Sequence, residues 1–333
     1  MKVLFLGGTG NISAACVERA LALGHDVSVL NRGNHPLTFA RPVRQIIGDR
    51  HDLTVLQEAA AGHYDVVANF LGFTPDEVAL DISVFSGQVS QYVYVSSAAA
   101  YSRPLPYYLV TEETPLRNPY WQYARDKIAC EETLFAAYLE HSFPLTVVRP
   151  SYTYGDTFIP SGVGGHGYTI VARMRARKPI ISAGDGQNLW VLTHNTDFAV
   201  GFVGLFGQQA AIGEAFHITS DEVMTWDAIY GAIGVAAGVE PELLHMSTDF
   251  IAGLCPDLGP GLYGDKAHSV VFDNTKIKRF VPAFQARVSF AEGIARAIAW
   301  HDADPVNRHI VNARVDAMFD RLVAAHRMAL AQG

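Results

Sequence analysis

Three side chains along the sequence have the types and spacing for acid–base chemistry at a hydroxyl or carbonyl group. Tyr123 and Lys127 are four residues apart in a segment with helical character, so they share one helical face. A phenol with its ordinary pKa of roughly 10 is a poor base at neutral pH, but a nearby ammonium stabilises the phenolate and lowers that pKa. The pair therefore predicts proton transfer coupled to movement of a hydride.

A serine hydroxyl precedes this pair, at the end of the apolar run Tyr92–Ser96. Ser97 is predicted to hydrogen-bond the reacting oxygen and to steady its developing charge, and Ser96 is the second choice. An ordinary strand end closed by a serine is the alternative. The alternative would be favoured for this serine taken alone, but Tyr123 and Lys127 at the start of the following helix favour the catalytic interpretation. Ser97, Tyr123 and Lys127 are thus the predicted catalytic residues.

The first 150 residues alternate short β-branched runs with helical stretches, which predicts a doubly wound α/β fold of the Rossmann type. The expected strands are 2–6, 26–30, 44–47, 65–70, 92–96 and 145–149, and the expected helices are 12–23, 53–61, 77–86 and 123–141. Apolar strands separated by helices indicate a parallel sheet covered on both faces.

The pattern changes after residue 150, and the sequence predicts a smaller C-terminal α+β part. Residues 154–168 read as a loop, 214–218 and 268–272 as strands, and 225–238 as a helix. We expect a dinucleotide-binding domain at 1–155, rejoined by a segment near 190–220, and a mainly substrate-binding domain at 156–333. Apolar residues near the C-terminus recur at helical spacing, which predicts a docked helix or, less favourably, a subunit contact; they are Ile310, Val311, Val315, Met318, Phe319, Leu322 and Val323.

The glycine-rich segment after the first strand predicts a dinucleotide site. Gly7 suits a tight turn, Gly10 leaves room for a pyrophosphate, and the helix that follows offers unpaired N–H groups to that anion. Ser13 stands where a third glycine is usual, and a small residue there still permits close packing. The alternative is a tight turn with no ligand.

The residues after the second and third strands bear on the choice of cofactor. A carboxylate that would bind the ribose 2′-hydroxyl is missing at Leu30–Gly33, and Arg32 can pair with a 2′-phosphate through its planar fork. NADP is therefore favoured, while NAD bound through Asn31 stays open. Asp49 is expected either to accept a hydrogen bond from the adenine amino group or to cap the helix near Leu53.

Composition counts against several classes of protein, namely nucleic-acid-binding, membrane-spanning, secreted and disulfide-rich ones. The chain has 333 residues, 17% of them charged, and a formal net charge of −8, which disfavours a protein built around phosphate-backbone contacts. No apolar run reaches the length of a membrane span, and the N-terminus does not read as a signal peptide. Cys16, Cys130 and Cys255 are too far apart to suggest a disulfide framework. We expect a cytoplasmic protein without a metal site.

An ordered set of motifs resembles the NAD-dependent epimerase/dehydratase family of extended short-chain dehydrogenases. The set comprises Gly-Gly-Thr-Gly at 7–10, Gly-Asp at 48–49, Tyr-Val-Ser-Ser at 94–97, Tyr-x-x-x-Lys at 123–127, Arg-Pro-x-x-x-Tyr-Gly at 149–155, His-Asn-Thr-Asp at 194–197 and Asp-Asn-Thr-Lys at 273–276. The resemblance implies the same catalytic three residues and a homodimer. The predicted cofactor contacts are Gly7, Thr9, Gly10, Asn11, Ile12, Asn31, Arg32, Asp49, Arg50, Phe70, Leu71, Gly72, Tyr123, Lys127 and Pro150.

Departures from the family pattern bear on the substrate. Ala98 and Ala99 replace the acidic pair of sugar-nucleotide dehydratases, which counts against dehydration. Trp190 stands where sugar-nucleotide epimerases place an arginine for the diphosphate, and Lys266 is a weaker clamp. These departures favour a free sugar, a glycoside or a polyol-like substrate over a nucleotide-linked sugar. The predicted substrate contacts are Ser97, Tyr152, Trp190, His194 and Lys266.

A looser resemblance links the glycine turn and Gly48-Asp49-Arg50 to atypical family members that bind chloroplast RNA. The sequence therefore leaves two functions open. The favoured one is an NAD(P)-dependent epimerase or reductase acting on a sugar-like substrate. The alternative is a non-catalytic nucleotide-sensing or RNA-binding protein on the same fold.

Overall fold

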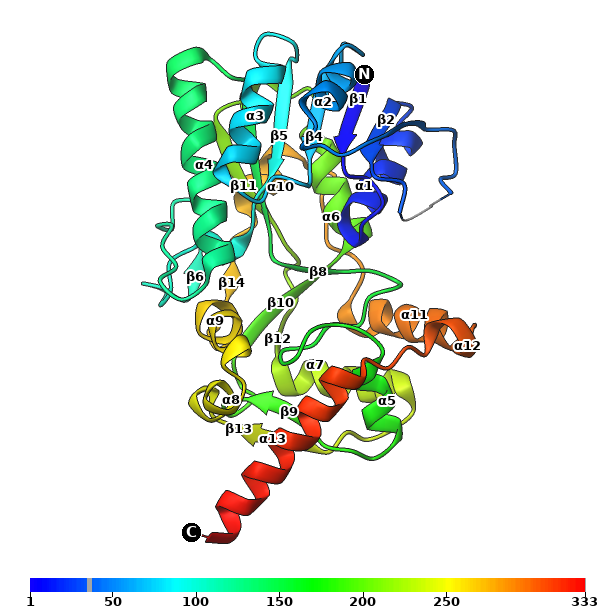
Figure 1. Cartoon of the computed structure of the whole chain (residues 1–333), viewed down its shortest axis with the longest axis vertical. Helices are drawn as coiled ribbons and strands as arrows, with labels where there is room; N and C mark the ends of the chain where they lie inside the picture. Colours follow the sequence, from blue (N-terminus) through cyan, green and yellow to red (C-terminus); the bar gives the residue numbers. More distant parts are fainter. Residues whose placement is uncertain (35–37, 333) are drawn as a thin grey trace.

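A seven-stranded parallel sheet forms the upper half of the molecule (Figure 1). The computed structural model describes residues 1–34 and 38–332. The strands run in the order β11-β7-β5-β4-β1-β2-β3. Their bounds are β1 Lys2–Leu6, β2 Asp26–Asn31, β3 Arg44–Ile47, β4 Val66–Asn69, β5 Gln91–Val95, β7 Leu145–Pro150 and β11 Glu214–Ile218.

Helices cover both faces of this sheet because successive strand residues point to opposite sides. In β1, Val3 and Phe5 pack into one core and Leu4 and Leu6 into the other. Helices on the Val3 side are α1 Asn11–Ala22, α6 Asn195–Gly204 and α10 Thr275–Phe280, and those on the Leu4 side are α2 Leu53–Ala60, α3 Pro75–Phe85 and α4 Gln122–His141. The predicted doubly wound Rossmann-type sheet is confirmed.

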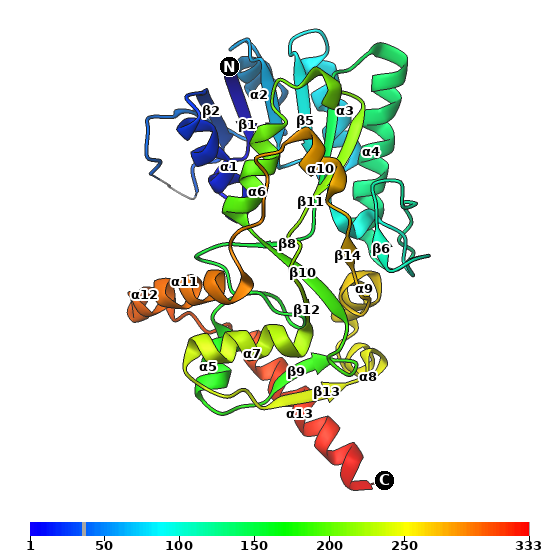
Figure 2. The same ribbon diagram turned by 180° about the vertical axis from the view of Figure 1, so that it is seen from behind.

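The lower half contains three small sheets and shorter helices around a third core (Figures 1 and 2). Its strands are β6 Leu109–Val110, β8 Tyr152–Tyr154, β9 Ile180–Ala183, β10 Leu189–His194, β12 Val223–Thr225, β13 Leu243–Met246 and β14 Val271–Phe272. The sheets run β12-β10-β8, β13-β9 and β14-β6. Its helices are α5 Thr169–Arg175, α7 Trp226–Ala237, α8 Thr248–Leu254, α9 Gly259–Gly261, α11 Phe290–Asp302, α12 Pro305–Arg308 and α13 Ala313–Gln332.

Four tight helical turns complete the fold. Three are 3₁₀ turns, η1 Ala98–Ala100, η2 Gln209–Ala211 and η3 Pro256–Leu258, and one is a π-helical turn, η4 Leu262–Lys266. Short π-helical segments are rare and often lie at functional sites. η1 begins three residues after the end of β5, beyond Ser96 and Ser97. Asn118 ties η4 to η1, because its Nδ2 donates to Ala99 O at 2.9 Å and to Gly264 O at 2.7 Å.

The C-terminal prediction is correct only in part. Phe319, Leu322 and Val323 in α13 are buried in the lower core, as a docked helix requires. Ile310 and Val311 precede the helix and are 69% and 44% exposed, so their assignment to its apolar face is wrong. The cause is the break after α12, which resets the helical phase. No helix in the described part of the chain is long and apolar enough to cross a membrane.

Candidate functional site

The glycine turn has the backbone geometry that its sequence predicts. Gly7 has φ of 79°, a left-handed value that favours glycine. A Cβ on Gly8 would come within 2.6 Å of Val29 Cγ1, so this position also requires glycine for packing. Gly10 caps α1, and its backbone N–H donates to Ser13 Oγ at 3.0 Å. Ser13 therefore fits under the turn in place of a third glycine.

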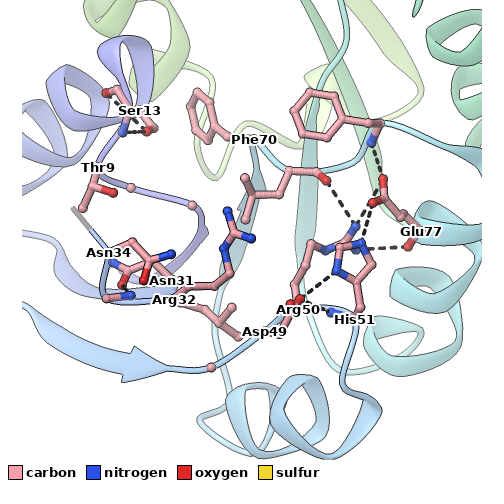
Figure 3. Close-up of a pocket in the computed structure, with 18 of the residues that line it drawn as sticks. Thr9, Ser13, Asn31, Arg32, Asn34, Asp49, Arg50, His51, Phe70 and Glu77 are labelled. Carbon is pink, nitrogen blue, oxygen red and sulfur yellow. Dashed lines mark hydrogen bonds and ion pairs between the residues drawn. The ribbon is translucent and has the colours of Figure 1, made fainter.

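A cavity of about 460 Å³ opens beside this turn, at the carboxyl ends of β1, β2, β3 and β4 (Figure 3). Such an edge is where dinucleotides lie in open α/β sheets. Most of the predicted cofactor contacts line the cavity: Gly7, Thr9, Gly10, Ile12, Asn31, Arg32, Asp49, Arg50, Phe70 and Leu71. Gly8, Ser13, Asn34, His51, Phe73 and Glu77 also line it and were missed as contacts.

The remaining predicted cofactor contacts lie away from this lining. Asn11 acts as a link, because its Nδ2 donates to Thr153 O at 3.0 Å and its carbonyl accepts from Asn195 Nδ2 at 2.7 Å. Gly72 accepts a hydrogen bond from Lys127 Nζ at 2.6 Å. Pro150 ends β7, where it pairs with β11. Their roles toward a cofactor stay predictions.

Asp49 is held by His51, not by the start of the next helix. Asp49 Oδ1 accepts from the His51 backbone N–H at 3.0 Å and lies 2.7 Å from His51 Nδ1. These contacts lower the pKa of Asp49. The cap of α2 is Asp52, which accepts from Thr54 N at 2.9 Å, so the helix-cap alternative for Asp49 is wrong.

His51 bridges two carboxylates at the rim of the cavity. Its Nε2 lies 2.7 Å from Glu77 Oε1 while Nδ1 contacts Asp49. Hydrogen bonds from these carboxylates, Glu77 first, raise the pKa of His51. Arg32 is exposed, and Figure 3 shows it extending into the cavity from the opposite side. The rim therefore carries one arginine and a histidine held between two acids.

Arg50 lines the cavity, but its guanidinium is turned into the protein. It donates to Leu71 O at 3.2 Å, Glu77 O at 3.1 Å and Asp81 Oδ1 at 2.7 Å. Asp81 is fully buried, which raises its pKa to about 6 even though Arg50 opposes the shift. Since Asn69 Nδ2 also donates to Asp81 at 2.7 Å, this network fixes the loop that carries Phe70 and Leu71. Arg50 thus shapes the cavity wall.

The structure brings Ser97 and Tyr123 together. Ser97 follows β5 and caps η1, and Tyr123 is the second residue of α4. Ser97 lies close enough to Tyr123 for its hydroxyl to lower the pKa of the phenol. Burial is the larger effect, and with the negative charge of Asp265 it raises that pKa above the ordinary value. The expected lowering of the Tyr123 pKa is therefore wrong for this arrangement.

Lys127 does not lower that pKa because its ammonium is engaged elsewhere. Nζ donates to Gly72 O at 2.6 Å, Val95 O at 2.9 Å and Tyr94 Oη at 3.2 Å. It also lies 4.8 Å from the centre of the Phe73 ring. Burial lowers the pKa of Lys127 to about 8. Lys127 therefore joins the cavity wall at Phe73 to the helix that carries Tyr123.

Ser96 points away from Tyr123 into a buried ion pair. Its Oγ donates to Glu131 Oε1 at 2.5 Å. Arg149 also donates to Glu131, through Nε at 3.0 Å and through a terminal nitrogen at 2.6 Å. Another Arg149 nitrogen reaches Tyr101 Oη at 3.2 Å. Glu131 and Arg149 are 1% and 4% exposed. This pair joins α4, β5 and β7 directly behind the predicted catalytic serine.

Three of the predicted substrate contacts gather in the lower half. Lys266 Nζ lies 4.3 Å from the centre of the Trp190 six- and five-membered ring system and 4.5 Å from that of Tyr152. The two rings meet edge to face with centres 6.3 Å apart. Lys266 also donates to Asp265, which was missed because a lone aspartate outside any motif gives no sequence signal. Their role toward a substrate stays a prediction.

His194 lies apart from this group. Its ring packs edge-on against Tyr154 at 5.2 Å between centres, and its Nε2 lies 3.0 Å from Asp156 Oδ1. Nδ1 lies 2.7 Å from Thr196 Oγ1 at the start of α6. His194 is 1% exposed. Its contacts are those of a buried helix cap, and no contact joins it to Tyr152, Trp190 or Lys266.

Gly10 provides a test of anion binding at the turn. Its φ of −85° suits any residue, and an added Cβ meets nothing closer than Ser13 Oγ at 3.4 Å. We predict that Gly10→Ala changes the free energy of unfolding by less than about 0.5 kcal/mol but weakens dinucleotide binding by about tenfold or more. Calorimetric titration measures the binding. Gly231→Ala, in open space on α7, is the control, and unaltered binding by Gly10→Ala would remove the turn from the site.

Comparison with known proteins gives a family match and several relatives. The model of the NAD dependent epimerase/dehydratase family matches residues 3–219. The 2′-dehydrokanamycin reductase of Streptomyces kanamyceticus is 27% identical over 86% of this chain and 81% of its own length. Chloroplast stem-loop binding protein of 41 kDa b from Arabidopsis thaliana is also 27% identical, over 73% of this chain and 65% of its own.

Solved structures share the fold. The UDP-glucose 4-epimerase of Bifidobacterium longum, solved in complex with NAD+ and UDP, superposes with a TM-score of 0.74. The alignment covers 92% of this chain and 99% of that one at 19% identity. At this identity the likeness concerns the fold, and it agrees with the sheet order and helical layers described above.

Proposed function

We propose, for a chain that belongs to the NAD dependent epimerase/dehydratase family, hydride transfer at a secondary alcohol or carbonyl carbon of a sugar-like substrate. Membership makes the chain an NAD(P)-dependent epimerase or oxidoreductase of the short-chain dehydrogenase/reductase superfamily. The observation that carries the proposal is the placement of Ser97 beside Tyr123 at the start of α4. Lys127 lies one helical turn further along and contacts Phe73 in the wall of the glycine-turn cavity.

The proposed chemistry assigns a role to each side chain. Bound NADP or NAD accepts or supplies the hydride. Tyr123 Oη takes the proton of the substrate hydroxyl during oxidation and returns it to the carbonyl oxygen during reduction. Ser97 Oγ donates a hydrogen bond to the same oxygen. Lys127 Nζ is held by carbonyl oxygens in this structure. On cofactor binding it would give up part of these contacts and donate to the nicotinamide ribose, and its positive charge would then favour the phenolate of Tyr123.

NADP is the proposed cofactor, because Arg32 extends freely into the cavity near the expected position of the adenosine ribose. Asp49 and Glu77 both hydrogen-bond His51 and raise its pKa, so the cationic form of His51 offsets part of their negative charge at the rim. We predict that NADPH binds about tenfold or more tightly than NADH, and that Arg32→Glu reverses the order. Fluorescence titration of both nucleotides measures this. Tighter binding of NADH by the parent protein would refute the preference.

The proposed substrate is a free sugar, a glycoside or a similar polyol rather than a nucleotide-linked sugar. Trp190, at the position expected of a diphosphate-binding arginine, packs against Tyr152 and Trp226. The relative named a 2′-dehydrokanamycin reductase supports net reduction. Dehydration is not proposed, since Ala98 and Ala99 carry no acid. The lower half, residues 156–333 for the most part, is the proposed substrate domain, and a homodimer is the proposed assembly.

Cofactor exchange tests the proposal and separates its two forms. An epimerase oxidises and re-reduces one carbon, so it keeps the same nucleotide through many turnovers, whereas a reductase must release it each time. The purified protein is assayed with NADPH and a panel of ketosugars, and the nucleotide that stays bound is identified by mass spectrometry. Consumption of NADPH in proportion to product identifies a reductase. Neither nucleotide binding nor hydride transfer with any panel member would reject the enzymatic proposal.

A second candidate function is nucleotide sensing or RNA binding without catalysis. The similarity to the Arabidopsis stem-loop binding protein supports it. The net charge of −8 counts against it, as does the placement of Ser97 beside Tyr123, which binding alone does not need. Stem-loop RNA binding that weakens steeply with salt, in a protein without hydride transfer, would favour this function.

The cytoplasm is the proposed compartment. All three cysteines lie in the described part of the chain, where they are buried and form no disulfide. Burial of the Cys16 thiol raises its pKa well above the ordinary value, which makes it unreactive. Three buried thiols fit a reducing environment. In residues 1–34 and 38–332, no group of His, Cys, Asp and Glu side chains is arranged to hold a metal ion.

A further inference from the structure

A carboxylate and two aromatic faces meet around a lysine ammonium. The turn that carries the carboxylate packs against the start of α4, because Gly264 lies directly against Trp121, two residues before Tyr123. We call Asp265, Tyr152 and Trp190, with Lys266 between them, the ammonium subsite. Lys266 Nζ lies 4.3 Å and 4.5 Å from the ring centres of Trp190 and Tyr152 and hydrogen-bonds Asp265. A carboxylate and aromatic faces are the groups that proteins use to bind organic ammonium ions.

The carboxylate is held in place by a second cation. Arg103 is 2% exposed and donates to Asp265 Oδ1 at 3.4 Å. Its other terminal nitrogen donates to the carbonyls of Tyr101 at 3.2 Å and Ser102 at 3.1 Å. One oxygen of Asp265 therefore faces a fixed guanidinium, and the other oxygen, Oδ2, faces the ammonium of Lys266.

Lys266 is the exchangeable member of the group. Asp265 and Lys266 are sequence neighbours at the end of the π-helical turn η4, and their side chains are 12% and 20% exposed. The Lys266 side chain keeps partial contact with solvent, and a lysine side chain that swings into solvent regains rotamer freedom and hydration. Trp190 is 2% exposed with Lys266 in position, so departure of this side chain uncovers an aromatic face.

We propose that the ammonium subsite binds the amino group of an amino-bearing, sugar-like substrate, which displaces the ammonium of Lys266. The proposal rests on the proposed function, because it places this group beside the ring whose hydroxyl or carbonyl Tyr123 serves. The charge balance is conserved, since one ammonium replaces another between Asp265 and the two rings. Lys266 thus fills the subsite until substrate arrives.

The electrostatics near Tyr123 favour a cation over an anion. Asp265 raises the pKa of both Tyr123 and Tyr152 after the larger effect of burial, so its negative charge reaches both phenols. Arg103 does not offer a free cation to an anionic group, because carbonyls and Asp265 already surround its terminal nitrogens. Trp190 Nε1 is buried and has no hydrogen-bond partner among the described residues, which leaves a donor for a neutral substrate oxygen.

Binding of three simple sugars tests this inference without requiring turnover. Glucosamine carries the ammonium, N-acetylglucosamine has it neutralised, and glucose has a hydroxyl in its place. The sugars are titrated calorimetrically into the full chain saturated with the nicotinamide cofactor that binds more tightly, or into the chain alone if neither cofactor binds. We expect glucosamine to bind about tenfold more tightly than the other two sugars. Equal binding of the three sugars, or no measurable binding of glucosamine, would overturn the proposal.

Two variants distinguish a cationic ligand from an anionic one, because they change the binding affinity of each in opposite directions. Lys266→Met removes the competing ammonium and is expected to tighten glucosamine binding, whereas Asp265→Asn is expected to abolish the preference for glucosamine. Asp257→Asn, 92% exposed at its side chain, is the matched control. If Lys266→Met instead weakens binding of glucose 6-phosphate while glucosamine is unaffected, the subsite recognises anions and the proposal fails. Should Asp265→Asn unfold, the sign of the Lys266→Met effect alone decides.

Failure of this inference and failure of the proposed function remain distinguishable. Dinucleotide titration and hydride transfer to ketosugars report on the glycine turn and on Tyr123, and neither depends on an amino group. A protein that transfers hydride but binds all three sugars equally retains the proposed function and loses the ammonium subsite. A protein that prefers glucosamine without any hydride transfer keeps the subsite and loses the proposed function.

Discussion

Replacing Tyr123 with Phe is expected to lower kcat for hydride transfer by about 10²–10⁴-fold, the usual contribution of a positioned acid or base. The variant loses only the phenolic oxygen that exchanges the proton with the substrate. The ring remains packed against Trp121, whose centre lies 4.9 Å away, so the helix start keeps its shape. Loss of the polar contact between the phenol and Ser97 should cost roughly 1 kcal/mol of stability at most. Single-turnover kinetics with bound NADPH measure the chemical step directly.

Dinucleotide affinity is a second readout for this variant. Tyr123 is a predicted cofactor contact but does not line the glycine-turn cavity, so we expect the affinity to change far less than kcat. Tyr120→Phe is the matched control for removal of a phenol, since Tyr120 is 44% exposed and contacts Tyr263. We expect Tyr120→Phe to retain the parent rate. Undiminished single-turnover rates in Tyr123→Phe would exclude Tyr123 as the proton-transfer group and would require a different acid.

Replacing Glu131 with Ala is expected to lower the free energy of unfolding by about 3–5 kcal/mol, since it leaves the charge of Arg149 buried without its partner. Burial opposes the charge of Arg149, yet the attraction and hydrogen bonds of Glu131 outweigh burial and raise its pKa. The variant also removes the acceptor of Ser96 Oγ. Urea unfolding followed by circular dichroism measures the loss.

Glu132 gives the matched control, because it is the next residue of α4 and is exposed. Glu132→Ala should change stability by less than about 0.5 kcal/mol. The Glu131→Ala variant, where it stays folded, should also show a slower chemical step, because Ser96 adjoins the serine that contacts Tyr123. A loss of stability no greater than that of Glu132→Ala would mean that solvent or another acid satisfies Arg149.

Strand and turn positions in the upper half were predictable because their causes are local. β1 and β3 match the expected bounds. β1 is an apolar run that becomes a buried parallel strand, whereas β3 is a largely exposed edge strand with the sequence Arg-Gln-Ile-Ile. The cavity at the glycine turn was also predictable, because strand, glycine turn and helix follow one another directly. The short strands β8, β9, β12 and β13 were not, since each is set by pairing with a distant segment.

Side-chain direction explains most of the errors at the site. Arg50 was expected to face a cofactor, but its guanidinium turns inward to a buried acid, Asp81, on another helix. His194 matches a family motif by type and caps a helix in the fold. Asp265 and Lys127 show the same limit, since their partners come from carbonyls and cations far away in the chain. Residue types are readable from the sequence, but the groups that they meet are not.

The amide of Asn11 has a mechanical consequence. Its Nδ2 donates a hydrogen bond to the carbonyl of Thr153 in β8. The backbone carbonyl of Asn11 in turn accepts a hydrogen bond from Asn195 Nδ2 at the start of α6. Tyr152 lies one residue before the carbonyl that Asn11 grips. The loop proposed to hold phosphates and the strand that carries an aromatic wall therefore move as one piece. A hinge that opened the compartment between them would first have to break both amide contacts.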